Sequence, residues 1–140
     1  KAIGVSNFGV NHIKEILSWA DIGPCMNQIE LSPFLQRRGL SNFCKEEGIV
    51  TTAYSPLTHG IRIHDERLME IGKIYRKSAA QILIKWSLQK DNVVIPKSTN
   101  KERIKENIEV FDFTIEQKHM EILDALEEGF ATCWDPTIDP

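Results

Sequence analysis

The sequence predicts an α/β fold in which parallel β-strands alternate with α-helices. Three observations lead to this prediction: short apolar runs rich in β-branched residues recur along the chain, segments with helical periodicity separate them, and polar residues end each apolar run. Strands joined through a helix run parallel and are connected by right-handed crossovers. Their carboxyl ends should therefore share one edge of the sheet.

Four segments are predicted as buried strands because each is a short apolar or β-branched run that ends in polar or turn residues. The first three strand starts recur at about two dozen residues, as expected for stacked strand–helix units. The last interval is wider because it holds two helical patterns. The predicted strands span residues 2–5, 25–31, 49–54 and 92–95.

Six segments are predicted as helices from the spacing of their apolar residues. The last of them carries Ile122, Leu123 and Leu126 at helical spacing. The predicted helices span residues 10–19, 38–47, 65–77, 78–89, 101–107 and 115–126. No low-complexity stretch or linker interrupts the series, so we expect one domain, or part of one, over residues 1–140.

Two architectures fit this alternation: an open doubly wound sheet and an arc of a (β/α)8 barrel. Both bind ligands at the carboxyl ends of their strands. The polar residues at those ends are Ser6, Asn7, Gln28, Glu30, Tyr54, Ser55, Lys97 and Ser98. We therefore expect these side chains to share a ligand-binding face.

The composition favours a folded protein and argues against several classes of partner. Of the 140 residues, 41% are hydrophobic and 26% are charged, which is typical of a packed domain rather than a disordered chain. The net charge of -3 argues against nucleic-acid binding driven by charge. No apolar run approaches the roughly 18 residues needed to cross a bilayer, so no membrane association is expected.

Cysteine and histidine show no metal-ligand spacing. Cys25, Cys44 and Cys133 are odd in number and far apart, which indicates free thiols in a reducing, cytoplasmic setting. Cys44 lies at helical spacing and is expected to be buried. The histidines are scattered over predicted helices and loops, where we expect them at the surface: His12, His59, His64 and His119.

A basic turn follows the fourth strand, in the segment VVIPKSTNKERIKENIEVFDF at residues 93–113. It brings cations, hydroxyls and the amino end of a helix to one place, a combination that binds an anion. A capped surface helix would also explain it, because Thr99 and Glu102 have capping-box spacing and Arg103 can pair with Glu106. The candidate anion-binding residues are Lys97, Ser98, Thr99, Asn100 and Arg103.

Four motifs follow one another at successive strand ends: GVSNF at residues 4–8, NQIELSP at 27–33, AYSPL at 53–57 and IPKSTNKERIKENIEVFDF at 95–113. Together with WDPT at 134–137, they resemble the carboxyl-terminal half of an aldo-keto reductase. The resemblance implies the last four strands of a TIM-type (β/α)8 barrel that binds NADP(H) without a Rossmann motif and reduces aldehydes or ketones to alcohols. The sequence agrees, since it contains no GxGxxG or Walker motif.

By this resemblance, the basic turn would hold the 2′-phosphate and adenosine of NADP(H), with Glu106 and Asn107 near the adenine. The planar, charged Arg103 suits both a phosphate and a flat base. Ser55 and Leu57 would line the pyrophosphate.

The resemblance also assigns Tyr54 to stacking on the nicotinamide, and Ser6, Asn7 and Gln28 to hydrogen bonds with its carboxamide. Trp134 would belong to a tail that closes over the substrate. Each assignment has a plainer alternative. Tyr54 fits a core aromatic, Ser6 and Asn7 fit helix caps, and Trp134 fits simple packing of the tail.

In the family, a Tyr with an Asp, a Lys and a His from the first half of the barrel supplies the proton for carbonyl reduction. The resemblance places no catalytic residue in this chain, and neither Tyr54 nor Tyr75 is a convincing substitute. A complete barrel takes roughly 250 residues. We therefore expect a partial domain that is inactive alone, and whose open sheet edges lead it to self-associate or to pair with the missing amino-terminal half.

Two other functions fit the same residues. The first is a truncated, non-catalytic module that binds NADP(H) or a protein partner. The second is an open-sheet nucleotide binder, which a different strand order would reveal.

Overall fold

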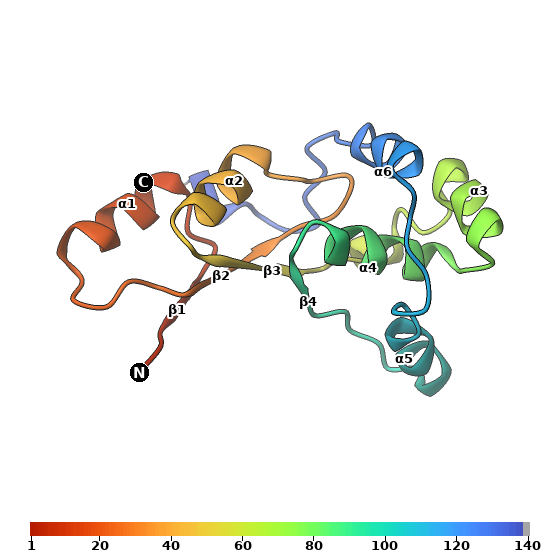
Figure 1. Cartoon of the computed structure of the whole chain (residues 1–140), viewed down its shortest axis with the longest axis horizontal. Coiled ribbons are helices and arrows are strands. Elements are labelled where there is room, and N and C mark those ends of the chain that lie inside the picture. The colour runs from red at the N-terminus through yellow and green to blue at the C-terminus, as the bar shows by residue number, and fades with distance from the viewer. Residues whose placement is uncertain (139–140) are drawn as a thin grey trace.

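A four-stranded parallel sheet lies at the centre of the computed structural model, which describes residues 1–138 (Figure 1). Its strands are β1 (Gly4–Ser6), β2 (Met26–Glu30), β3 (Val50–Tyr54) and β4 (Val93–Val94). Ser6 lies opposite Gln28, Gln28 opposite Thr52, and Thr52 opposite Val93. Because the strand order is β1-β2-β3-β4, the structure contradicts a doubly wound sheet and has the order of a barrel arc.

Within residues 1–138, six α-helices and two 3-10 helices connect and follow the strands. The α-helices are α1 (Val10–Trp19), α2 (Arg38–Glu46), α3 (Glu66–Tyr75), α4 (Ala79–Gln89), α5 (Lys101–Ile108) and α6 (Gln117–Asp124). The 3-10 helices are η1 (Thr58–Gly60) and η2 (Pro136–Ile138). All six predicted α-helices are confirmed, each bound lying within two residues of the predicted one. Between residues 1 and 138, no helix has the length and apolar character that crossing a membrane requires.

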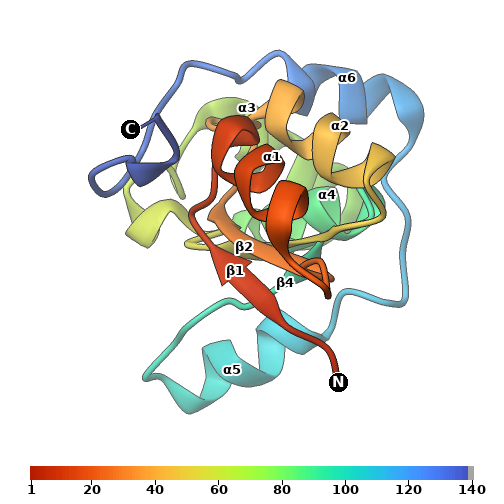
Figure 2. The same ribbon diagram turned by 90° about the vertical axis from the view of Figure 1, so that its left-hand side faces the viewer.

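Two apolar cores fix these elements. Helices α1 and α2 lie on one side of the strands and α5 on the other (Figure 2). The core against the sheet consists of Ile13, Ile29, Leu31, Leu40, Cys44, Ile49 and Ala53. Cys44 is fully buried there, as predicted, and burial raises the pKa of its thiol.

The second core joins α3, α4 and α6 to the loop after β2. Its buried members are Phe34, Leu68, Ile71, Ile82, Leu83, Trp86, Ile115, Met120, Leu123 and Leu126. Burying each large apolar side chain contributes about 1.5–3 kcal/mol of transfer free energy. This core therefore holds the carboxyl-terminal helices on the barrel arc.

The prediction of a surface position is wrong for His119, which is buried in α6. The Tyr75 hydroxyl lies 2.7 Å from His119 Nδ1, and the two rings meet edge to face at 5.5 Å. The Glu116 N–H donates to the same hydroxyl at 2.8 Å. The imidazole can be buried because a residue 44 positions away supplies its polar partner.

The sheet has two open edges, because β1 and β4 each pair with a single strand of the described chain. Apolar side chains are exposed at both: Ile3 precedes β1 and is 43% exposed, and Val93 in β4 is 48% exposed. An apolar groove beside β4 is lined in part by Val94, Pro96, Ile104, Ile108 and Phe111. Such edges are surfaces for pairing with another chain or segment.

Candidate functional site

The turn after β1 lies against β2 through backbone hydrogen bonds. The Asn7 N–H and the Ser6 hydroxyl both donate to the Gln28 carbonyl, at 2.9 and 3.1 Å. The buried Asn27 side chain clamps the next residue: its Nδ2 donates to the Phe8 carbonyl at 2.8 Å, and its Oδ1 accepts the Phe8 N–H at 3.3 Å. The three residues predicted to bind a carboxamide are therefore neighbours.

Asn7 carries an unused hydrogen-bond acceptor. Its backbone is left-handed, with φ of 58°, and its Oδ1 is buried without a partner among the described residues. An orphan buried acceptor is uncommon in native proteins and costs free energy. It fits a ligand that brings an N–H donor. The plainer alternative was that Ser6 and Asn7 cap the first helix. The N-cap of α1 is instead Gly9, so neither residue has that role.

Tyr54 ends β3, opposite Glu30 of β2, and is half-buried. Burial raises the pKa of its phenol and the charge of Glu30 raises it further, with smaller opposing effects from Arg37 and from the Asn7 side chain. A phenol that stays protonated suits contact with a flat ligand ring. A phenol with reduced acidity does not suit proton donation.

The helix cap after the basic turn differs from the expected one. Asn100 is the N-cap of α5, and its side chain accepts the Arg103 N–H at 2.9 Å, whereas the capping-box spacing predicts Thr99. The Asn100 N–H donates to the Ser98 hydroxyl at 3.1 Å, which tightens the turn. Asn100 therefore shapes the site through the backbone of the turn.

Lys97 and Arg103 keep their charges available. Neither forms an ion pair within residues 1–138, so the alternative of an Arg103–Glu106 pair is not realised. Lys105 on the same helix differs, since its Nζ lies 3.9 Å from a Glu109 carboxylate oxygen. Cations without an internal counter-ion are suited to bind an anionic ligand.

A cavity of about 900 Å³, named here the α5 cavity, lies between the loop after β3 and α5. Its volume is within the range of small-molecule sites. Seven of the predicted cofactor residues line it: Ser55, Leu57, Lys97, Ser98, Arg103, Glu106 and Asn107. Thr99 is exposed, and neither Thr99 nor Asn100 lines the cavity.

A second cavity, of about 540 Å³ and named here the tail cavity, brings Ser6 and Asn7 together with Trp134. Trp134 itself is 73% exposed, although the tail that carries it lies against the barrel, as the plainer alternative of simple tail packing supposed. Gln28 and Tyr54 line neither this cavity nor the α5 cavity. The predicted residues thus fall into two cavities, with four of them outside both.

Buried charged residues hold the tail that carries Trp134. The Thr132 N–H donates to Glu30 Oε1 at 2.8 Å, and Arg37 Nη1 lies 2.8 Å from Asp135 Oδ2. Burial acts to raise the pKa of Asp135, but the hydrogen bonds from Arg37 and from the tail outweigh it and hold that pKa below its usual value. Glu30 and Arg37 therefore anchor the tail next to the tail cavity.

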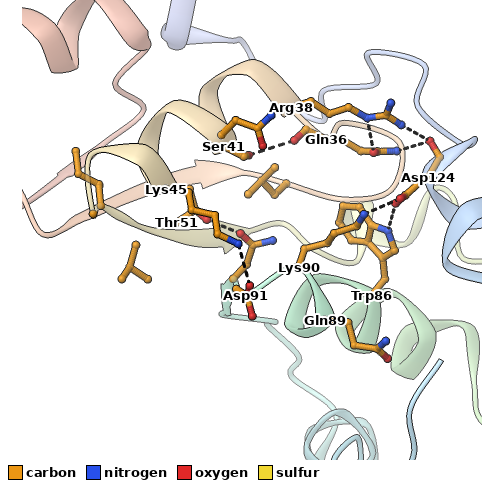
Figure 3. Close-up of a pocket in the computed structure, with 16 residues that line it drawn as sticks. Gln36, Arg38, Ser41, Lys45, Thr51, Trp86, Gln89, Lys90, Asp91 and Asp124 are labelled. Carbon is orange, nitrogen blue, oxygen red and sulfur yellow. Dashed lines mark hydrogen bonds and ion pairs between the residues drawn. The ribbon is translucent and has the colours of Figure 1, made fainter. Parts of the chain in front are cut away.

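A third cavity, of about 700 Å³ and named here the α2–α4 groove, lies between those two helices (Figure 3). Two of its cations form ion pairs: Lys90 Nζ lies 2.6 Å from Asp124 Oδ2, and Lys45 Nζ lies 3.3 Å from Asp91 Oδ2. The third, Arg38, forms no ion pair within residues 1–138 but donates to Gln36 Oε1 at 3.0 Å and to the Asp124 carbonyl at 2.8 Å. Trp86 Nε1 also donates to Asp124, at 2.8 Å. None of the predicted site residues lines this groove.

The sequence matches the model of the Aldo/keto reductase family over residues 1–128. The chain belongs to this family. It is 46% identical to an uncharacterised oxidoreductase of Schizosaccharomyces pombe, over 100% of its own length and 51% of that protein. It is 44% identical to a glyoxal reductase of Bacillus subtilis, over 91% and 46%. A Bombyx mori aldo-keto reductase in complex with NADP aligns with 94% of the chain and 46% of its own, at a TM-score of 0.89 and 33% identity.

This aldo-keto reductase chain spans about half the length of the curated relatives it matches. It likewise covers 49% of a solved aldo-keto reductase from a deep-sea metagenome, with a TM-score of 0.91. The solved relatives are (β/α)8 barrels, and the consecutive parallel strands described above form half of such a barrel. The predicted fold class is therefore confirmed.

Sequence reasoning missed two histidines of the α5 cavity in this member of the family. His59 and His64 line the cavity beside Lys97 and Arg103, and His59 Nε2 lies 2.9 Å from Ser55 Oγ. A signal was present, because Ser55 and His59 are four residues apart in a tight Gly- and Pro-containing turn. The motif-based assignment ended two residues before His59.

Proposed function

We propose that this chain is the NADP(H)-binding half of an aldo-keto reductase that reduces aldehydes or ketones to alcohols. The α5 cavity carries the proposal. It gathers seven of the predicted cofactor residues, including two cations without an internal counter-ion, at the carboxyl ends of parallel strands. The NADP complex of the Bombyx mori relative supports the same class of cofactor.

The residues present fit NADP(H) at both ends. Lys97 and Arg103 would hold the 2′-phosphate, and the planar guanidinium of Arg103 can also contact the adenine. Ser55 would face the pyrophosphate from the other wall of the α5 cavity. At the nicotinamide end, the orphan Oδ1 of Asn7 would accept a carboxamide N–H, and Tyr54 would contact the ring. When bound, NADPH supplies the hydride for carbonyl reduction.

The described chain offers no suitable proton donor for that reduction. The pKa of Tyr54 is raised by burial, and the Tyr75 hydroxyl is engaged by His119 and by the Glu116 N–H, away from both site cavities. We therefore propose that the isolated chain binds NADP(H) without reducing carbonyls. Catalysis would require the Tyr, Asp, Lys and His of an amino-terminal half.

The open edges support a partner for this half-barrel. Both β1 and β4 present an unpaired edge, and apolar side chains are exposed beside them. An amino-terminal half would close the barrel by pairing with both edges, and in its absence self-association would cover the same surfaces. The carbonyl substrate would then bind beside Trp134, which lines the tail cavity.

The alternative is a non-catalytic NADP(H)-binding module. It is favoured by the absence of a tuned proton donor from the described residues and agrees equally with the α5 cavity. Adding an amino-terminal half from a relative distinguishes the two. Carbonyl-dependent oxidation of NADPH by the mixture supports the enzyme half, whereas binding with no turnover supports the module.

The test of the proposed cofactor is a fluorescence titration of the purified chain with NADPH. Saturable binding is expected, and Arg103→Ala should raise Kd by about 10- to 100-fold because a charge-assisted hydrogen bond contributes about 1.5–3 kcal/mol. Lys101→Ala is the matched control, since it removes the same charge from the first turn of α5 without lining the cavity. Absence of binding by a folded chain would reject the proposal.

A further inference from the structure

The loop after β3 has an unusual backbone. Three of its non-glycine residues are left-handed, with φ of 48° at Ser55, 51° at Thr58 and 52° at His59. Such conformations are strained, above all for the β-branched Thr58, and persist where the surroundings hold them. The buried Thr58 hydroxyl does so by donating to the Leu57 carbonyl at 2.8 Å and accepting the Arg62 N–H at 3.1 Å. These hydrogen bonds therefore fix the positions of Ser55 and His59 relative to each other.

That relation is a contact of 2.9 Å between Ser55 Oγ and His59 Nε2, at the wall of the α5 cavity. The other titratable and charged groups that line this cavity come from the loop and from the basic turn with α5: His64, Lys97, Arg103 and Glu106. The nearby Arg62 and Asp65 are bound elsewhere, to Glu128 and Arg67. His59 thus faces the space opposite two unpaired cations.

We infer that His59 makes the binding of the anionic cofactor proton-linked, so that NADPH binds more tightly when His59 is protonated. This inference rests on the proposed function of the α5 cavity. In the imidazolium form, Nε2–H must donate to Ser55 Oγ, and the Ser55 hydroxyl proton is then free to donate to a phosphate oxygen. One proton taken up by His59 therefore supplies a third cation and directs a second donor at the pyrophosphate.

The expected effect is a gain of about fivefold in NADPH affinity from one added charge at a water-exposed site. It appears as the pH falls from about 8 to about 6, the interval in which histidine changes its charge. The 2′-phosphate of NADPH loses charge near pH 6 and acts in the opposite direction. Comparing the chain with His59→Gln cancels that contribution, because both bind the same ligand.

The experiment measures the NADPH Kd at about pH 6, 7 and 8 for the unmodified chain, His59→Gln and His64→Gln. The exposed His59 side chain can be replaced without disturbing the core, which circular dichroism checks. We expect His59→Gln to lose the acid-side gain of about fivefold and His64→Gln to retain it. Calorimetry in buffers of different ionisation enthalpy should show that the unmodified chain takes up more protons on binding than His59→Gln does, because the proton exchange of the 2′-phosphate is common to both.

Each outcome decides something different. If His59→Gln binds NADPH with the same pH dependence and proton uptake as the unmodified chain, the inference about His59 fails while the cofactor site stands. If the loss appears in His64→Gln instead, the proton link belongs to the wrong histidine and the inference also fails. If no variant binds NADPH at any pH while Arg103 is intact, the proposed function itself fails.

Discussion

The α5 cavity and the α2–α4 groove are of similar size, but their cations are used differently. In the groove, Lys90 pairs with Asp124 and Lys45 pairs with Asp91, and the Arg38 guanidinium donates hydrogen bonds to the neutral Gln36 amide and the Asp124 carbonyl (Figure 3). In the α5 cavity, Lys97 and Arg103 form no ion pair within the described part of the chain. A count of basic residues would not separate the two sites. What distinguishes the α5 cavity is that neither an ion pair nor a side-chain hydrogen bond within residues 1–138 engages Lys97 or Arg103, and we therefore propose this cavity for an anionic ligand.

The two cavities also differ in the backbone that forms them. The α5 cavity is bounded by a loop with three left-handed non-glycine residues, whereas among the described residues that line the groove Asp91 alone is a left-handed non-glycine residue. Strain at ligand-binding loops persists because the surrounding fold stabilises it. We therefore propose that the groove serves stability and that the α5 cavity serves binding, a division that substitutions in each cavity can test.

The largest expected effect is on stability, at the floor of the groove. Trp86 is 2% exposed and donates to Asp124, so Trp86→Ala should lower the free energy of unfolding by about 3–5 kcal/mol. Trp134→Ala is the control, because that side chain is 73% exposed and its loss should change the free energy by less than about 0.5 kcal/mol. Urea denaturation measures both. Equal effects from the two tryptophans would show that burial does not distinguish these regions.

A middle-sized effect is expected at the tail, where a paired charge lies beside a candidate site. The pKa of Asp135 is held below its usual value by Arg37 and the tail, so the pair stabilises the fold above the ordinary Asp pKa of about 3.9. Asp135→Asn should lower the free energy of unfolding by about 1 kcal/mol at neutral pH.

The pH dependence of this stability loss tests whether it comes from the charge of Asp135. The difference between Asp135→Asn and the unmodified chain should shrink as the pH falls below about 4, because protonation removes the same charge. Asp21→Asn serves as the control, since Asp21 is exposed and forms no ion pair in residues 1–138. A deficit in Asp135→Asn that persists at acid pH would contradict an ion pair with Arg37.

The smallest effect is expected at the outer rim of the groove. The side chains of Lys45 and Asp91 are 76% and 81% exposed, and such surface pairs contribute roughly 0–1 kcal/mol. Lys45→Ala should therefore change the free energy of unfolding by less than about 0.5 kcal/mol in urea denaturation. A loss several times larger would mean that the groove depends on its exposed pair as much as on its buried floor.

Local pattern predicted most of the fold. Apolar patterning located every strand and α-helix of residues 1–138. It did so even for β1 and β4, which contain no buried residue, and for α5, which buries only Asn107. The helix cap was missed because Thr99 and Asn100 are adjacent and either can place an oxygen near an amide three residues on. His119 was missed because its partner, Tyr75, is supplied by tertiary packing that no local pattern reports.

The candidate site was predicted only in part, because local sequence pattern reports strand ends but not loop conformation. Strand ends can be located in the sequence, so residues such as Ser55 and Lys97 could be predicted to lie at the same carboxyl edge of the sheet, and both line the α5 cavity. Which residues line which cavity depends on loop conformation. His59 lines the α5 cavity because the backbone of its loop is left-handed at several residues, and neither helical nor strand periodicity predicts such a conformation.

The most direct test of the division between binding and structural cations compares Arg103→Ala with Lys90→Ala by NADPH titration and urea denaturation. Arg103→Ala should raise Kd by about 10- to 100-fold and change the free energy of unfolding by less than about 0.5 kcal/mol. Lys90→Ala should lower that free energy by about 1 kcal/mol and change Kd by less than about twofold. Intact NADPH binding in Arg103→Ala, or weakened binding in Lys90→Ala, would contradict the assignment of the two cavities.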